Sequence, residues 1–125
     1  MIKPKHLILA LVAGLWTSAA LAGPFEDGAE AFKRGDYARA LTAWGPIADT
    51  NPEVQNSLGV MYMHGEGIRP DYQRAYMWVT LSAAQGMPKA AINRDILQKQ
   101  MSPQDIDIAM KMAARCKHSN YHACN

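Results

Sequence analysis

The stretch from residue 56 to residue 86 reads NSLGVMYMHGEGIRPDYQRAYMWVTLSAAQG, and it decides the predicted fold. Apolar residues at helical spacing in its first half predict a helix that ends at Gly65, because glycine readily adopts the left-handed conformation that stops a helix. Asp71 is a typical N-cap for a second helix that runs to Gln85. The stretch is therefore predicted to be helix, turn, helix.

The second helix of this stretch is apolar on two faces. One face carries Tyr72, Ala75, Tyr76, Val79 and Ala83, and the other carries Met77, Trp78, Leu81 and Ala84. A helix that is apolar on two faces usually packs between neighbours, which predicts a layered stack of helices. Gly59 is expected where two helices approach closely. We expect four residues to be among the most buried: Leu58, Tyr62, Ala75 and Trp78.

The same stretch carries a repeat pattern. The matching positions are Leu58-Gly59-x-x-Tyr62-x-x-Gly65-x-Gly67, then Asp71-Tyr72-x-x-Ala75-x-x-Trp78, and then Ala83-Ala84-x-Gly86. The pattern resembles one complete Sel-1-like repeat, from a family within the tetratricopeptide-like superfamily. Residues 91–97 and 101–106 also resemble the end of short secreted bacterial members. The resemblance implies an all-α fold, a short right-handed α-solenoid of about three helix-turn-helix pairs.

A five-residue pattern, Asp-Tyr-x-Arg-Ala, occurs at residues 36–40 and again at 71–75, and such a return is typical of a helical repeat array. We predict a first repeat-like helix pair over residues 23–50, the complete repeat over 51–86, a degenerate capping helix pair over 87–116, and a tail over 117–125. An atypical terminal unit covers the open end of the core in such arrays, and we expect it to keep the protein a monomer.

Three details of the flanking pairs are predicted. Asn51 and Ser102 are expected to cap the helices that follow them. Pro46 lacks a backbone N–H and is expected to kink the second helix of the first pair near Thr42. The last helix is expected to face the core with four residues: Ile106, Ala109, Met110 and Ala113.

Residues 1–22 have the features of a secretory signal peptide. Lys3 and Lys5 precede an apolar run, and a small-x-small cleavage site ends at Ala22. The apolar run is shorter than the roughly 20 residues that a spanning helix needs. We therefore predict cleavage after Ala22, a periplasmic or secreted protein, and no stable membrane insertion after cleavage.

The charge of the chain argues against nucleic acid as a partner. The chain has 13 Lys and Arg residues against 11 Asp and Glu residues. Two of the lysines lie in the predicted signal peptide, so its removal would make the two counts equal. Phosphate binding needs a basic face, which a balanced charge does not indicate.

The sequence contains no pattern typical of catalysis. No serine after residue 22 lies in a Gly-x-Ser-x-Gly elbow or precedes a lysine by three positions. A secreted, cysteine-rich branch of the Sel-1-like family has been linked to penicillin binding and β-lactamase activity. The resemblance therefore leaves an alternative, a protein that binds or hydrolyses cell-wall fragments or β-lactams. That branch has a cysteine pair in each repeat, whereas this chain has two cysteines in all. We predict no catalytic residue and no cofactor.

Cys116 and Cys124 are the two cysteines, and export would place them in an oxidising compartment. We predict a structural disulfide between them that closes the tail. The tail also contains His118 and His122, so a zinc site made of these four residues is the alternative. The four lie closer together in sequence than the ligands of a known zinc finger, which favours the disulfide.

We predict an exported, non-enzymatic interaction or adaptor module that binds a protein or peptide. In the related tetratricopeptide arrays the first helix of each pair lines a concave groove. Carried over by position, the resemblance implies a groove that includes Glu26, Glu30, Lys33, Arg34, Asn56, Val60, Met63 and His64. For each of these residues, the alternative to a role in binding is that its side chain is simply solvated or faces the core.

Overall fold

The structure is a computed structural model that describes residues 22–65 and 67–124. These residues form α1 (Pro24–Lys33), α2 (Tyr37–Trp44), the 3-10 helix η1 (Gly45–Ile47), α3 (Pro52–His64), α4 (Tyr72–Ala84), α5 (Pro88–Gln98) and α6 (Pro103–His118). The predicted signal peptide lies outside the described residues except for Ala22. None of the described helices is long and apolar enough to cross a membrane.

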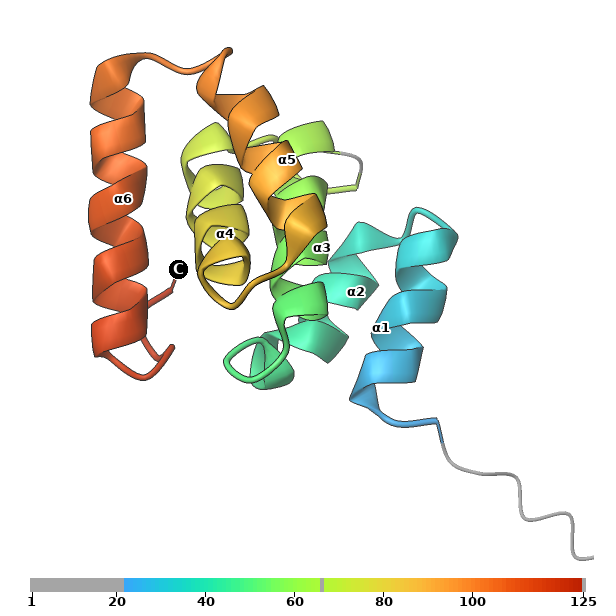
Figure 1. Cartoon of the computed structure of the whole chain (residues 1–125). Helices are drawn as coiled ribbons and strands as arrows, with labels where there is room; N and C mark the ends of the chain where they lie inside the picture. The colour runs from blue at the N-terminus through green and yellow to red at the C-terminus, as the bar shows by residue number, and fades with distance from the viewer. Residues whose placement is uncertain (1–21, 66, 125) are drawn as a thin grey trace, which may run out of the picture.

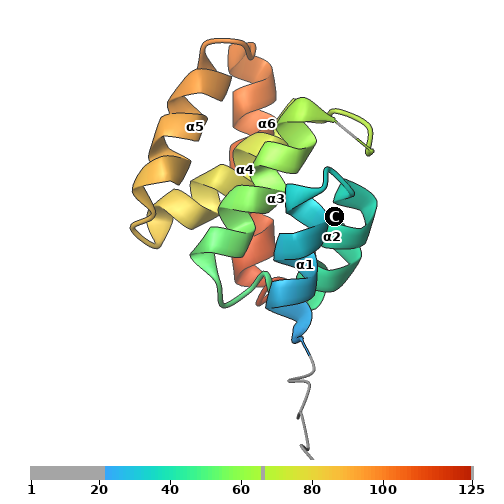
Figure 2. The same ribbon diagram turned by 90° about the vertical axis from the view of Figure 1, so that its right-hand side faces the viewer.

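The helices are stacked in pairs along the chain, which confirms the prediction of an all-α short solenoid. α1 packs on α2 and α3 packs on α4, while α5 and α6 both pack against α4. Figure 1 shows α6 at one end of the array and α1 at the other. Figure 2 looks along the array with the first pair towards the viewer. The central position of α4 is the physical reason for its two apolar faces.

Side-chain caps set four of the helix starts: Asp36 Oδ1 accepts the Arg39 N–H at 3.2 Å at the start of α2, and the other three caps were predicted. Asn51, Asp71 and Ser102 each accept a backbone N–H of the following first turn with a side-chain oxygen. The other end of α3 is set by Gly65, whose φ is 66°, and its N–H donates to the Met61 carbonyl at 2.8 Å. Glycine takes this left-handed conformation without the steric cost that a side chain would add.

The core is built on α4 and the facing side of α3. The four residues predicted to be among the most buried are Leu58 at 0%, Tyr62 at 9%, Ala75 at 0% and Trp78 at 5% exposure. Tyr72 and Ala84, which were predicted to lie on packed faces, are instead exposed. They are the first and last residues of α4, so they extend past its neighbours, and the Tyr72 hydroxyl donates to Gln100 Oε1 at 3.1 Å.

The predicted kink near Thr42 is wrong. α2 ends at Trp44, and the tighter 3-10 helix that follows carries Pro46 within its first two positions. Proline has no N–H to donate into an α-helix but fits the first turn of a new helical segment. Pro46 therefore ends the α-helix rather than bending it.

The predicted position of Met110 in the core is also wrong, because Met110 is 46% exposed. The buried face of α6 runs at spacings of four and three residues through Ala109, Ala113 and Cys116. Met110 lies one residue further along from Ala109, and therefore about 100° around the helix from that stripe. With Met110, the terminal pair exposes Ile92, Ile96 and Ile108. The monomer stays a prediction, which sedimentation can test.

Gly59 lies where α3 and α4 approach each other. A Cβ atom at this position would lie 2.5 Å from Val79 Cγ1 and 3.1 Å from the Ala75 carbonyl oxygen. We expect Gly59→Leu to lower the free energy of unfolding by about 2 kcal/mol, because a side chain here would force two packed helices apart.

Urea denaturation checks this expectation, with Ala84→Leu as the matched control. Ala84 is the exposed last residue of α4, so a leucine there does not enter the contact between α3 and α4. The control should therefore stay within about 0.5 kcal/mol of the parent protein. Equal losses of stability in the two variants would contradict the close approach at Gly59.

Candidate functional site

A cleft with a volume of about 440 Å³ follows the first helices of the three pairs. Each of these three helices, α1, α3 and α5, contributes residues at helical spacing, and Trp44 and Met87 complete the lining. The contributions are Phe25, Ala29, Phe32 and Lys33 from α1, Glu53, Asn56, Ser57 and Val60 from α3, and Lys89 and Asn93 from α5. Positions three or four apart share one face of a helix, so three neighbouring helices give one continuous surface.

One wall of the cleft is aromatic and held in place. The Phe32 ring stacks on Tyr37 with centroids 5.3 Å apart, and it is tilted against Trp44 at 5.6 Å. The Trp44 indole N–H donates to the Phe25 carbonyl at 3.0 Å. Gly28 leaves room for the indole, since a Cβ there would overlap the ring. The wall is therefore a preformed apolar surface for a side chain of a ligand.

Polar groups complete the cleft. The Asn93 side-chain N–H donates to Asn56 Oδ1 at 2.9 Å, which joins α5 to α3. The Asn56 amide nitrogen and the Asn93 oxygen retain hydrogen-bonding capacity, and such groups match the N–H and C=O of an extended peptide. Lys33 and Lys89 contribute two positive charges, against the single negative charge of Glu53. The cleft thus favours a ligand with an acidic group.

The groove predicted from the sequence overlaps this cleft in part. Three of its residues line the cleft: Lys33, Asn56 and Val60. The other five lie outside it: Glu26, Glu30, Arg34, Met63 and His64. Glu30 and Arg34 form an exposed ion pair, with 2.7 Å between Oε1 and Nη1, while Met63 packs at the edge of the core. Binding by any of these residues stays a prediction.

Several residues of the cleft were not predicted from the sequence. Phe25, Ala29 and Phe32 stand at spacings of four and three residues, and that pattern was a usable signal for one face of a helix. Asn93 offers no comparable signal, because it belongs to the degenerate pair, where the repeat pattern no longer fixes which positions face the cleft.

The tail is closed by the predicted disulfide. Cys116 and Cys124 are joined, with their Cα atoms 4.5 Å apart. The bond uses both sulfurs, so the alternative zinc site with His118 and His122 has no thiolate ligand. Within residues 22–65 and 67–124, no group of three or more His, Cys, Asp and Glu side chains is placed to hold a metal ion.

Residues 52–87 match the family model of the Sel1 repeat. The match covers α3, α4 and the turn between them, which is the stretch where the repeat pattern was found in the sequence. Neither a curated protein nor a solved structure matches the chain.

Proposed function

Because the chain carries a Sel1 repeat over residues 52–87, we propose that it is an exported, non-enzymatic adaptor that binds an extended segment of a partner protein. Sel1 repeats are protein-interaction modules. The observation that carries the proposal is the cleft of α1, α3 and α5, where three helices from three pairs present one preformed surface. Fold alone does not fix function, so the proposal rests on the chemistry of this surface.

The cleft suggests the chemistry of the partner segment. An apolar or aromatic side chain packs against the wall made by Phe32 and Trp44. The amides of Asn56 and Asn93 bind the backbone of the segment, and an acidic residue lies near Lys33 or Lys89. Peptide recognition by surface grooves commonly combines these features.

Export is supported by two independent features. Residues 1–22 have the sequence of a cleavable signal peptide, and the bond between Cys116 and Cys124 is of the kind that persists in oxidising compartments. We expect protein recovered from the periplasm or medium to begin at Gly23, as intact mass would show. Exported protein that retains residues 1–22 would contradict the cleavage site.

The absence of catalysis is part of the proposal. The Sel1 match favours an interaction module and does not favour the β-lactam alternative. We expect the purified protein neither to hydrolyse nitrocefin nor to be labelled by a fluorescent penicillin. Turnover of nitrocefin would show that the protein is an enzyme.

Site-specific crosslinking tests the cleft. A photo-crosslinking amino acid at Lys33, inside the cleft, should give a discrete protein adduct in the cell, whereas the same group at Ala114, exposed on α6, should not. Val60→Asp should abolish the adduct by placing a carboxylate on the apolar floor, because burying an unpaired charge is costly. Ile108→Asp is the matched control, since this residue is exposed on α6, outside the cleft. Equal adducts at both positions, or no effect of Val60→Asp, would contradict the proposed site.

A further inference from the structure

The surface of the cleft continues along α5 beyond the residues that line it. Lys89 and Asn93 line the cleft. Ile96 follows Lys89 by seven residues, and seven residues bring an α-helix back to within about 20° of the same face. Ile92 lies four residues before Ile96, so it shares this side of the helix. The side chains of Ile92 and Ile96 therefore extend the surface that the cleft presents on α5.

The exposed apolar surface of α5 is confined to this side. Ile92 is 60% exposed and Ile96 is 43% exposed. The rest of the exposed surface of α5 is polar and includes Asp95 and Gln98. Gln98 lies two residues after Ile96, which places it about 200° around the helix. A terminal pair needs a polar outer face to keep a repeat array soluble, and α5 has such a face away from the cleft. The two isoleucines stand apart from it, beside the cleft.

The register between α3 and α5 places Ile96 level with the apolar floor of the cleft. The two helices run in the same direction, and the Asn93 side-chain N–H donates to Asn56 Oδ1 at 2.9 Å (Figure 1). Val60 is four residues past this hydrogen bond on α3, and Ile96 is three residues past it on α5. At roughly 1.5 Å per residue these steps are about 6 Å and about 4.5 Å along the two helices. Apolar residues thus follow one another across the array, from the aromatic wall over Val60 to Ile96.

The cations of the cleft are available to a ligand. Neither Lys33 nor Lys89 forms an ion pair with a carboxylate of residues 22–65 and 67–124. Lys89 lies on the same side of α5 as Ile96, so a ligand that covers this side would pass its ammonium group. An acidic side chain of the ligand would gain a charge-assisted hydrogen bond there.

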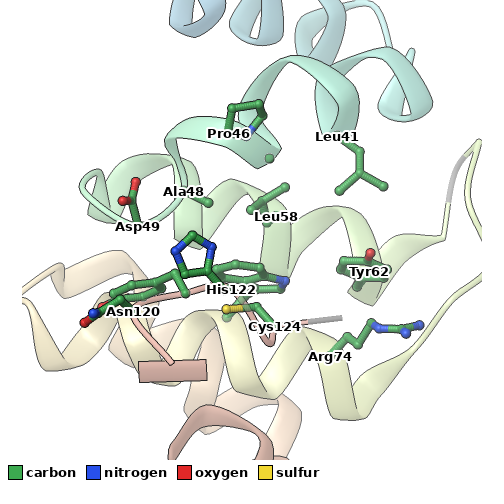
Figure 3. A pocket seen from close by; sticks show the side chains of 13 residues that line it. Leu41, Pro46, Ala48, Asp49, Leu58, Tyr62, Arg74, Asn120, His122 and Cys124 are labelled. Carbon is green, nitrogen blue, oxygen red and sulfur yellow. The ribbon is translucent and has the colours of Figure 1, made fainter. Parts of the chain in front are cut away.

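A second hollow, with a volume of about 530 Å³, lies on a different face of α3 and receives no residue from α5. Figure 3 shows it between the end of α2, which contributes Leu41, and the tail, which contributes His122. Among the described residues that line it, Arg74 is the only lysine or arginine, and its Nη1 lies 3.2 Å from Asp71 Oδ2. Unpaired cations beside apolar surface are thus a property of the cleft and not of this hollow.

We propose that one extended segment of the partner protein crosses the cleft with two apolar anchors, one on the aromatic wall and a second on Ile92 and Ile96. This proposal rests on the proposed function and names the chemistry of the same partner. Between the anchors the amides of Asn56 and Asn93 hold the main chain, and an acidic residue lies beside Lys89. Side chains of an extended segment alternate between its two sides, so the two apolar residues lie an even number of positions apart.

Site-specific crosslinking in the cell tests the second anchor with the full exported protein. A photo-crosslinking amino acid at Ile96 should give the same adduct as one at Lys33. Mass spectrometry should map both crosslinks to one segment of one partner. The same group should give no adduct at Gln98, on the opposite side of α5, or at His122, in the second hollow.

A matched pair of variants tests the apolar contact. Serine at both Ile92 and Ile96 should lower the yield of the Lys33 adduct about tenfold, because the second anchor loses its apolar surface. Ile108→Ser should leave the yield unchanged, since Ile108 is 44% exposed but lies on α6, outside the cleft. Both variants should keep the circular dichroism and thermal unfolding of the parent protein, because the replaced side chains are exposed.

The outcomes distinguish the second anchor from the adaptor cleft itself. An adduct at Lys33 without one at Ile96, an equal adduct at Gln98, or an undiminished Lys33 adduct in the double serine variant would overturn the second anchor and leave the cleft as proposed. An Ile96 adduct with twice the mass of the chain would show that a second copy covers α5, and would also overturn it. Absence of an adduct at both Lys33 and Ile96 would overturn both proposals.

Discussion

Trp78→Ala is expected to lower the free energy of unfolding by about 3–5 kcal/mol. Trp78 lies near the middle of α4, the helix that packs against α3, α5 and α6, and its side chain is 5% exposed. Truncation removes a large apolar surface from the core and leaves a cavity that rigid helices cannot close. Domains of ordinary stability have about 5–15 kcal/mol in total, so the loss is a large fraction of it and the variant should unfold at a much lower urea concentration than the parent protein.

Urea denaturation followed by circular dichroism measures this loss. Ile92→Ala is the matched control, because Ile92 is a large apolar residue on a neighbouring helix but is 60% exposed. The control should stay within about 0.5 kcal/mol of the parent protein. A Trp78→Ala variant that unfolds at the same urea concentration as the parent would show that α4 is not the centre of the core.

The sequence predicted the α3–α4 pair well because local and long-range signals agree there. Asp71 caps, Gly65 terminates, and the apolar positions of both helices face one another at repeat spacing. The first helix pair was predicted from the five-residue pattern that occurs at residues 36–40 and again at 71–75. Consistent signals at several levels make a segment predictable.

The terminal pair was less predictable because its orientation is set by tertiary packing. α6 packs against α4 rather than mainly against α5, so its buried stripe includes Cys116 and excludes Met110. The sequence of α6 was compatible with two apolar stripes, one that includes Met110 and one that includes Cys116, and periodicity alone could not choose between them. The monomer was predicted from the capping role of the terminal pair, whose exposed isoleucines only the structure showed.

The sites were harder to predict than the helices. The cleft depends on which rotation α1 and α5 adopt against α3, and the hydrogen bond between Asn56 and Asn93 joins residues 37 positions apart. A pocket lined by Leu41, Asp49 and His122 depends on the return of the tail towards α2. No local sequence signal encodes contacts at such separation.

The disulfide has the second large expected effect, and it acts mainly on the unfolded chain. Cys116 and Cys124 are separated by eight positions. In the chain-entropy model, closing a loop of about nine residues stabilises the folded state by about 2.6 kcal/mol. Both residues are also buried, at 0% and 6% exposure, so the bond contributes to the packing between α6 and the rest of the core.

Replacing both Cys116 and Cys124 with serine should therefore lower the free energy of unfolding by about 2.6 kcal/mol or more. Reduction of the parent protein should give a similar loss, whereas reductant should leave the double variant unchanged, because it has no bond to break. Urea denaturation in the presence and absence of reductant completes this comparison. Intact mass should show the parent lighter by two hydrogen atoms, with no thiol available to alkylation after denaturation. If reduction leaves the stability of the parent unchanged, the tail is held by the Ser119 side chain and the backbone hydrogen bonds and not by this bond.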